Sequence, residues 1–214
     1  MLPRLHLVTD DGVLAAPGFA ARAAGLMDAL GPASALHLRA RAHTALSLHA
    51  LAAELAPVAL RTGSLLVIND RVDIALAVRA GAHLHAGSLP VMEARRLMHH
   101  APLGYSAHGL EEAALAAAQG ADYVFLGTIY HSASHPGRAP AGPALIADVA
   151  PVLSVPVIAI GGITPARVAE LREVGAWGVA VISGVWAVAE PLAAARAYLD
   201  ALGDAARPGG ADRA

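Results

Sequence analysis

Short apolar segments rich in β-branched residues alternate along the chain with longer segments rich in Ala, Leu, Arg and Glu. The short segments predict eight strands, at Leu5–Thr9, Ala35–Arg39, Leu65–Asn69, Ala82–His85, Leu103–Ser106, Tyr123–Gly127, Val157–Ile160 and Val179–Ser183. The longer segments predict helices between them, including Leu46–Leu60, Arg71–Ala80, Pro90–His99, Leu110–Gln119, Pro143–Val152 and Pro165–Val174. Strands that alternate with helices pair in parallel through right-handed crossovers. Eight near-equal units in 214 residues therefore predict an α/β fold, a single (β/α)₈ TIM barrel over residues 1–202.

Glycine and threonine residues mark the expected ends of several helices. Thr164 stands before Pro165, which predicts a capped helix start with proline in the first turn. Three glycines each follow a helical segment and precede a strand, as helix-terminating glycines do: Gly81, Gly120 and Gly175. The first strand runs into Thr9-Asp10-Asp11-Gly12 rather than a glycine-rich turn, which disfavours a dinucleotide-binding Rossmann fold.

Composition narrows the classes of function. The chain is 56% hydrophobic and 15% charged, so it can bury enough apolar surface to fold, and only 203–214 is expected to be a disordered tail. A net charge of −2 without a basic stripe predicts no nucleic-acid partner. The absence of cysteine excludes disulfides and thiolate chemistry. No signal peptide and no apolar span of about 18 residues is found, so we expect a cytoplasmic protein with no membrane partner. The composition leaves open whether the protein forms a homo-oligomer.

The last two strands predict a phosphate site. In a TIM barrel the functional residues lie at the carboxyl ends of the strands. Strand seven ends in Gly161-Gly162 and strand eight in Ile182-Ser183-Gly184. Paired glycines let backbone N–H groups approach a phosphate closely. The alternative is that Gly161-Gly162 only makes a tight turn.

Two earlier strand ends carry charged and amide side chains. Arg39 and Arg41 share one side of an extended segment after strand two, and they suit a phosphate or carboxylate of a ligand. Asn69 and Asp70 follow strand three and would face a ligand or an ion. The alternatives are a solvated pair of arginines and a helix cap at Asn69-Asp70.

Strands five and six end in further polar residues. Ser106 and His108 follow strand five, and Thr128 follows strand six. The polar loop after Thr128 is long enough to cover a substrate, and it contributes His131, Ser132, Ser134 and His135. Single histidines are good acid/base groups because their pKa lies near neutrality. A histidine metal cluster is the less favoured alternative, because the helical His-Glu-x-x-His spacing is missing and only His83 and His85 share a strand face.

Taken together, these motifs resemble the thiamine phosphate synthase family, which includes the TenI-type thiazole tautomerases. The run Leu66–Ala75, with Asn69-Asp70 at its centre, resembles that family's strand-three signature. Leu38-Arg39-Ala40-Arg41 resembles its Leu-Arg-Glu-Lys segment, and Ser106-Ala107-His108 its Ser-x-His segment. Segments 157–165 and 179–183 are similar to the family's last two strands.

The resemblance implies a synthase reaction, but this sequence departs from the family's motifs at two places that disfavour it. A synthase of this family joins a pyrimidine diphosphate to a thiazole phosphate, with magnesium bound by the aspartate equivalent to Asp70 and by a second aspartate. Here Ser88 stands at the second position, and a hard divalent cation binds poorly without that carboxylate. The family's Thr-x-Thr-Lys loop reads Ser132-Ala133-Ser134-His135. Magnesium at Asp70 is therefore expected only if the synthase alternative holds.

The run Gly87-Ser88-Leu89 and the chain's ending are closer to the TenI-like branch. That resemblance implies an isomerase, a thiazole tautomerase that needs no cofactor and aromatises a thiazole carboxylate phosphate by a proton shift. Thr128 stands where the branch has its acid/base histidine, so His131 or His135 would have to replace it. A small phosphorylated thiazole is the expected partner. The alternatives are a thiamine phosphate synthase and a non-catalytic binder of a thiazole or thiamine phosphate.

Overall fold

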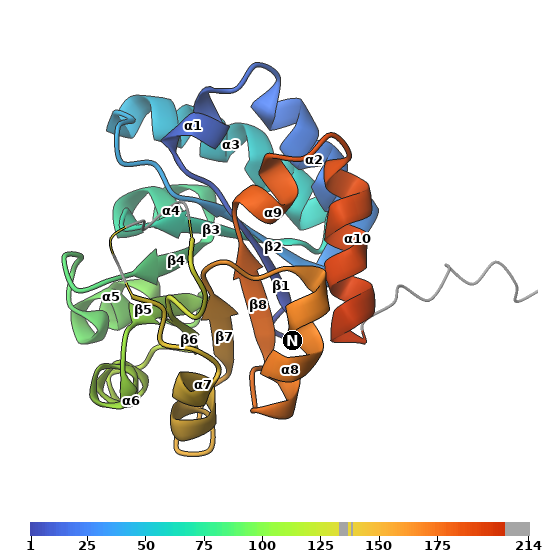
Figure 1. Ribbon diagram of the computed structural model, residues 1–214. Helices are drawn as coiled ribbons and strands as arrows, with labels where there is room; N and C mark the ends of the chain where they lie inside the picture. Colours follow the sequence, from blue (N-terminus) through green and yellow to red (C-terminus); the bar gives the residue numbers. More distant parts are fainter. Residues whose placement is uncertain (133–136, 138, 204–214) are drawn as a thin grey trace, which may run out of the picture.

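Eight parallel strands close into a barrel in sequence order, which confirms the predicted TIM barrel (Figure 1). The computed structural model describes residues 1–132, 137 and 139–203. The strands are β1 (Leu5–Val8), β2 (Ser34–Leu38), β3 (Leu65–Asn69), β4 (Gly81–Leu84), β5 (Leu103–Ala107), β6 (Tyr123–Leu126), β7 (Val157–Ile160) and β8 (Gly178–Val181). The barrel closes where β8 pairs with β1, with Val179 opposite Leu5. All carboxyl ends therefore lie at one end of the barrel.

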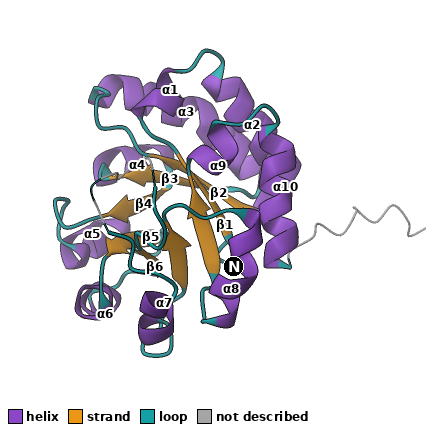
Figure 2. Ribbon diagram, in the orientation of Figure 1, coloured by secondary structure: helices purple, strands orange, loops and turns teal. Residues whose placement is uncertain are grey.

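Helices surround the strands, as the purple ring around the orange barrel shows (Figure 2). The six predicted helices correspond to α3 (Ala45–Thr62), α4 (Val72–Val78), α5 (Val91–Met98), α6 (Leu110–Ala118), α7 (Ala144–Val149) and α8 (Val168–Glu173). The described chain adds α1 (Asp11–Ala15), α2 (Phe19–Leu30), α9 (Ser183–Trp186) and α10 (Pro191–Leu202), with the 3₁₀ turns η1 (Gly31–Ala33) and η2 (Pro165–Arg167). Within the described ranges, no helix combines the length and apolar character that a membrane crossing needs.

Several predicted boundaries are wrong for local reasons. Gly81 begins β4, and the residue that caps the end of α4 is Arg79, in the left-handed conformation with φ at 57°. Thr164 precedes η2 but its side chain makes no capping hydrogen bond. Ser183 begins α9 instead of ending β8. Gly120 and Gly175 do follow their helices with positive φ, as predicted. The predicted tail lies outside the described residues from position 204 onward, and Gly203 caps α10.

The barrel interior is filled by aromatic and imidazole rings. Tyr123 and Phe125 form a cluster there with small and branched aliphatic residues of β1, β7 and β8. Three fully buried histidines lie against these rings: His6, His37 and His83. The ring centroids of His83 and Phe125 are 4.1 Å apart. A second and larger core lies between the strands and the outer helices.

Gly104 makes room for this interior packing. A Cβ atom at position 104 would lie 2.2 Å from Cζ of Tyr123 and 2.4 Å from Nδ1 of His83. Both neighbours are buried in the barrel, so neither ring can move aside without displacing others. Glycine at this position is therefore a packing requirement of the interior.

Replacing Gly104 with Ala should lower the free energy of unfolding by about 1–3 kcal/mol, the usual cost of overpacking a core. Urea denaturation followed by circular dichroism measures the change. Gly25→Ala is the matched control, because a Cβ there meets nothing within 4 Å and alanine favours the α2 helix. An unchanged free energy of unfolding in Gly104→Ala would show that the interior is loosely packed.

Candidate active site

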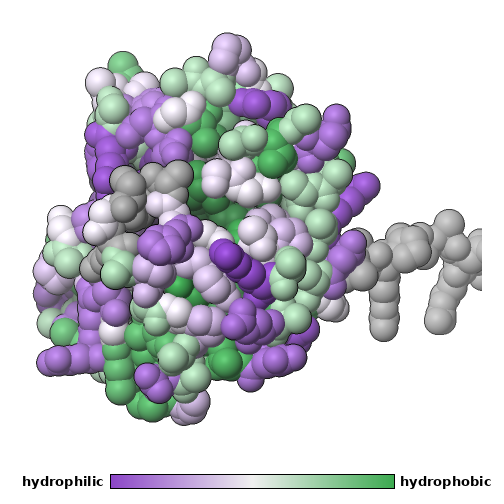
Figure 3. Space-filling model, viewed as in Figure 1, coloured by the Kyte–Doolittle hydropathy of each residue, from purple (hydrophilic) through white to green (hydrophobic). Residues whose placement is uncertain are grey.

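A cavity of about 350 Å³ opens at the carboxyl ends of the strands. It is lined by residues from the end of each strand or from the loop that follows it, and its bottom is formed by Val8, Phe125 and Ala180 of the barrel interior. In the space-filling view, hydrophobic residues are visible recessed between polar ones near the middle of the molecule (Figure 3). The sequence did not single out these apolar residues, although strand alternation places Phe125 on the inward face with Gly127.

The predicted phosphate loops meet at one side of this cavity. Gly161, Gly162, Ile182, Ser183 and Gly184 all line it. Gly161 and Gly162 have φ values of 105° and 62°, which favour glycine. The first residues of α9 have no intrahelical acceptor for their N–H groups, and the N–H of Gly162 takes part in no backbone hydrogen bond of the described chain. These amides point to an anion-binding end of the cavity.

The glycine pair also packs against the loop after β6. A Cβ at position 162 would lie 2.1 Å from the carbonyl oxygen of His131, and one at position 161 would lie 2.6 Å from Cγ2 of Thr128. The guanidinium of Arg167 donates to the Gly162 carbonyl at 2.6 Å and stacks on the ring of Tyr130. The Tyr130 hydroxyl in turn donates to Glu170 at 2.7 Å. Glycine is therefore required here by the neighbouring loop as well as by any bound phosphate.

The predicted arginines form a cationic end of the same cavity. Arg39 is half-buried and Arg41 is exposed, and both line the cavity. Burial, followed by the charge of Arg41, lowers the pKa of Arg39. Among the described residues, neither arginine has an acidic side chain within ion-pair distance. This arrangement favours an anionic ligand over a solvated surface pair.

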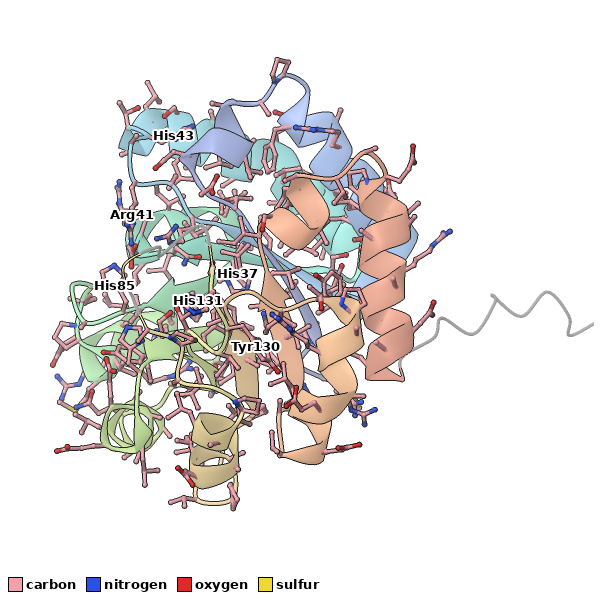
Figure 4. All side chains as sticks on the ribbon, in the orientation of Figure 1. His37, Arg41, His43, His85, Tyr130 and His131 are labelled. Atoms are coloured by element: carbon pink, nitrogen blue, oxygen red, sulfur yellow. The ribbon has the colours of Figure 1, made fainter. Side chains whose placement is uncertain are left out.

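Asp11, which the sequence did not single out, holds the segment that carries Arg41. Its carboxylate accepts hydrogen bonds of 2.9 Å from the backbone N–H groups of Arg41 and Ala42. The bond from Ala42 is the largest cause that lowers the pKa of Asp11, and His43 lies 3.5 Å away. Figure 4 shows Arg41 and His43 on the same side of the barrel. The signal for Asp11 was present in the acidic pair that directly follows strand one.

Asp70 is engaged by residues of this chain rather than poised for a metal ion. The Ser88 hydroxyl donates to its Oδ1 at 2.5 Å, and Nε2 of His85 lies 3.4 Å from the same oxygen. Nδ1 of His85 accepts from the Gly87 N–H at 2.8 Å, so a neutral His85 carries its hydrogen on Nε2, toward Asp70. His85 lines the cavity, whereas Asp70 and Ser88 are not among its lining residues.

This donor set does not fit magnesium. One carboxylate, one hydroxyl and one imidazole replace the two carboxylates that a hard cation prefers. In the described parts of the chain, no three or more His, Cys, Asp or Glu side chains are grouped to hold a metal ion.

The wall formed by strands five and six carries one imidazole. Thr128 is buried and Ser132 half-buried, and both line the cavity with the exposed His108. Nδ1 of His108 lies 2.7 Å from the Gly127 carbonyl oxygen and therefore donates to it. His131 is exposed and lies outside the cavity lining. The predicted roles of Ser134 and His135 fall outside the described residues.

The floor of the cavity carries the remaining predicted residues. Asn69 is buried, and Ser106 contacts Nε2 of His83 at 2.8 Å. His83 lines the cavity and also lies 3.3 Å from the Tyr123 hydroxyl. The sequence named His83 only in the less favoured metal alternative, although its inward position on an apolar strand was a signal for a place in the cavity.

A closed barrel whose cavity at the strand ends is lined by glycine-rich loops and arginines has the architecture typical of TIM barrels that act on phosphorylated ligands. The family model described as thiamine monophosphate synthase matches residues 5–185. A thiamine-phosphate synthase of Chloroflexus aurantiacus is 39% identical over 195 residues, which cover 90% of this chain and 89% of that protein. One of Methanospirillum hungatei is 36% identical over 204 residues, covering 92% and 97%.

A solved structure agrees with the sequence relatives. Thiamine phosphate pyrophosphorylase from Pyrococcus furiosus has a TM-score of 0.81 and 27% identity, and the match covers 96% of this chain and 97% of that one. The chain belongs to the thiamine monophosphate synthase family. The family prediction is thus confirmed, whereas the preference for the TenI-like branch receives no support from relatives that are named synthases.

Replacing Asp11 with Ala should weaken the binding of inorganic diphosphate about three- to tenfold, because Arg41 loses the anchor of its backbone. The depressed pKa of Asp11 means that the anchor is intact above its usual pKa and is lost as the pH falls through the lower value in the folded protein. Isothermal calorimetry measures the affinity. Asp28→Ala is the control, since Asp28 pairs only with exposed Arg61 in the described chain. Equal losses in both variants would contradict the anchoring role.

Proposed function

We propose that the protein is a thiamine-phosphate synthase, a transferase that joins a pyrimidine diphosphate to a thiazole phosphate and releases diphosphate. The observation that carries this proposal is the pair of anion-binding ends in one cavity, Arg39 with Arg41 at β2 and the glycine loops at β7 and β8. The reaction has two phosphorylated substrates, and each of them needs an anion-binding end of the cavity. The curated relatives support the same reaction.

The arginines would act on the leaving diphosphate. As the carbon–oxygen bond breaks, the diphosphate takes the electron pair and gains negative charge. Arg39 is held half-buried and charged, so its guanidinium stabilises that charge more strongly than a fully solvated cation would. The backbone amides after β7 and at the start of α9 would hold the phosphate of the thiazole. The residues around Asp70 do not fit magnesium, so no step is assigned to a metal.

Thiazole tautomerisation is the second candidate because His108 brings an imidazole to the cavity wall beside Thr128. An imidazole in that place can move a proton between ring positions, which Thr128 cannot do near neutral pH. His108 is better placed for this than His131, which lies outside the cavity lining. Incubation with the thiazole carboxylate phosphate tautomer, followed by NMR for aromatisation, separates this reaction from the synthase reaction and from binding alone.

The synthase reaction is tested by incubating the purified protein with the pyrimidine diphosphate and the thiazole phosphate. Thiamine phosphate and free diphosphate should form in equal amounts. Arg39→Gln should lower kcat/KM about 10- to 100-fold, the cost of losing a charge-assisted contact to the diphosphate. Arg22→Gln on the exposed face of α2 is the control.

The assay is run once with added magnesium and once with a chelator. Activity is then detected whether or not the reaction requires a metal ion. Absence of thiamine phosphate under both conditions would overturn the proposal. Equal loss in Arg39→Gln and Arg22→Gln would instead remove Arg39 from the diphosphate site.

A further inference from the structure

A second cavity, of about 280 Å³, lies where the strands begin, at the opposite end of the barrel from the candidate active site. Its walls come from residues at or just before the starts of β1, β7 and β8 and from the ends of α7 and α8. Two arginines, a tryptophan and an apolar segment line it: Arg4, Arg172, Trp177 and 155–157. The described residues that line the two cavities do not overlap, so a ligand here would occupy a separate site.

The position of Arg4 is fixed by the packing of the start of the chain against β8. The Arg4 carbonyl oxygen accepts from the N–H of Val179 at 2.8 Å, close to the N label of Figure 1. A Cβ at position 178 would lie 2.2 Å from that oxygen, so Gly178 permits the close approach. Nη1 of Arg4 donates to the Leu202 carbonyl at 3.3 Å, and Cζ of Arg4 lies 4.6 Å from the centre of the Trp177 ring. A guanidinium that is already held by stacking loses little freedom when it binds an anion.

Arg172 brings a second positive charge to this cavity from the last turn of α8. The residue is exposed, and within the described chain no acidic side chain lies within ion-pair distance of it. Among the described residues that line the cavity, none is acidic. The charge of Arg172 is therefore available to a ligand.

The negative ends of helices are the structural reason for placing arginines at this end of the barrel. The cavity touches the ends of α7 and α8, and Leu202, whose carbonyl accepts from Arg4, is the last residue of α10. Each helix end carries a charge of about −0.5, so the three together contribute about −1.5. Two guanidiniums contribute about +2. The cavity therefore keeps a net positive charge, and the helix ends alone do not account for both arginines.

We propose that this second cavity binds a compact phosphate ester. A phosphate monoester carries a charge of about −1.5 to −2 near neutral pH, which matches two guanidiniums, whereas a carboxylate carries a single charge. Its three terminal oxygens can accept from both planar guanidinium groups at once. Small-molecule pockets usually start at about 300 Å³, so the organic part is small, and it packs on the apolar segment 155–157. The site does not rest on the proposed synthase function.

A phosphate bound here would connect the two strands that close the barrel. Arg4 directly precedes β1 and Trp177 directly precedes β8, and these strands pair with each other. A ligand that binds only the folded chain stabilises it by mass action. Occupancy of the second cavity would therefore stabilise the closed barrel from the end that carries no substrate.

The chain has two tryptophans, and they report on the two cavities separately. Trp177 lines the second cavity, whereas Trp186 belongs to α9, whose first residues line the candidate active site. Both indole nitrogens are buried without a hydrogen-bond partner in the described structure, so their N–H signals respond to nearby charge. In ¹⁵N–¹H NMR at constant ionic strength, inorganic phosphate should shift the Trp177 signal until it saturates. The signal is assigned by its loss in Trp177→Phe.

Arg172→Gln should weaken phosphate binding at the Trp177 signal at least tenfold, because one of the two charged contacts is lost. Arg196→Gln is the matched control, since it removes the same charge from the exposed face of α10 and should leave the binding unchanged. Acetate should bind at least tenfold more weakly than phosphate, because it carries one charge for two guanidiniums.

A Trp177 response that does not saturate, or that persists in Arg172→Gln, would mean an adventitious ion only and would overturn the proposal. Equal losses in Arg172→Gln and Arg196→Gln, or equal binding of acetate and phosphate, would overturn it as well. These readouts are independent of turnover. A saturable Trp177 response that depends on Arg172, in a protein that forms no thiamine phosphate, would refute the proposed function alone.

Discussion

The packing of the barrel interior is the constraint on which the site depends. An eight-stranded barrel is just wide enough to be filled by side chains, and branched aliphatic residues usually fill it. Here imidazole and aromatic rings do so, and Gly104 leaves the space that Tyr123 and His83 occupy. Polar rings that are buried in such a place must be hydrogen-bonded. One arrangement of these rings therefore has to satisfy both their packing and their hydrogen bonds. His83 and Phe125 of this interior also line the cavity, so the core of the barrel and the cavity floor share side chains.

The loops above this floor stabilise one another in pairs. Asp11 of the first loop holds the backbone at Arg41 of the second, and Tyr130 after β6 is held by Arg167 and Glu170 after β7. Each pair joins loops far apart in sequence. The cationic end and the amide end of the cavity are thereby each built from two loops that contact one another.

The sequence was most informative where periodicity and motif agree. Alternating segments predicted all eight strands, and the residues after β2, β3, β5, β7 and β8 do line or adjoin one cavity. The sequence could not predict side-chain contacts between loops that are far apart along the chain. Asp11 and Arg41 are distant in sequence, and so are Ser88 and Asp70, where the backbone adopts the left-handed conformation. Departures from the family motif at Ser88 and His135 disfavoured a synthase, and Thr128 spoke against a standard tautomerase, yet similarity over most of the chain is to synthases. Local substitutions in a loop change binding chemistry more readily than they change membership of a family.

The neutral imidazoles of the interior also couple folding to protons. An unfolded chain protonates each histidine below pH about 6.5, whereas the folded protein keeps His6, His37 and His83 neutral because burial lowers their pKa values. The unfolded state therefore binds more protons in mild acid, so each ring lowers the free energy of unfolding as the pH falls below that point. These three rings therefore stabilise the folded barrel fully above the ordinary histidine pKa, and their contribution decreases as the pH falls below it.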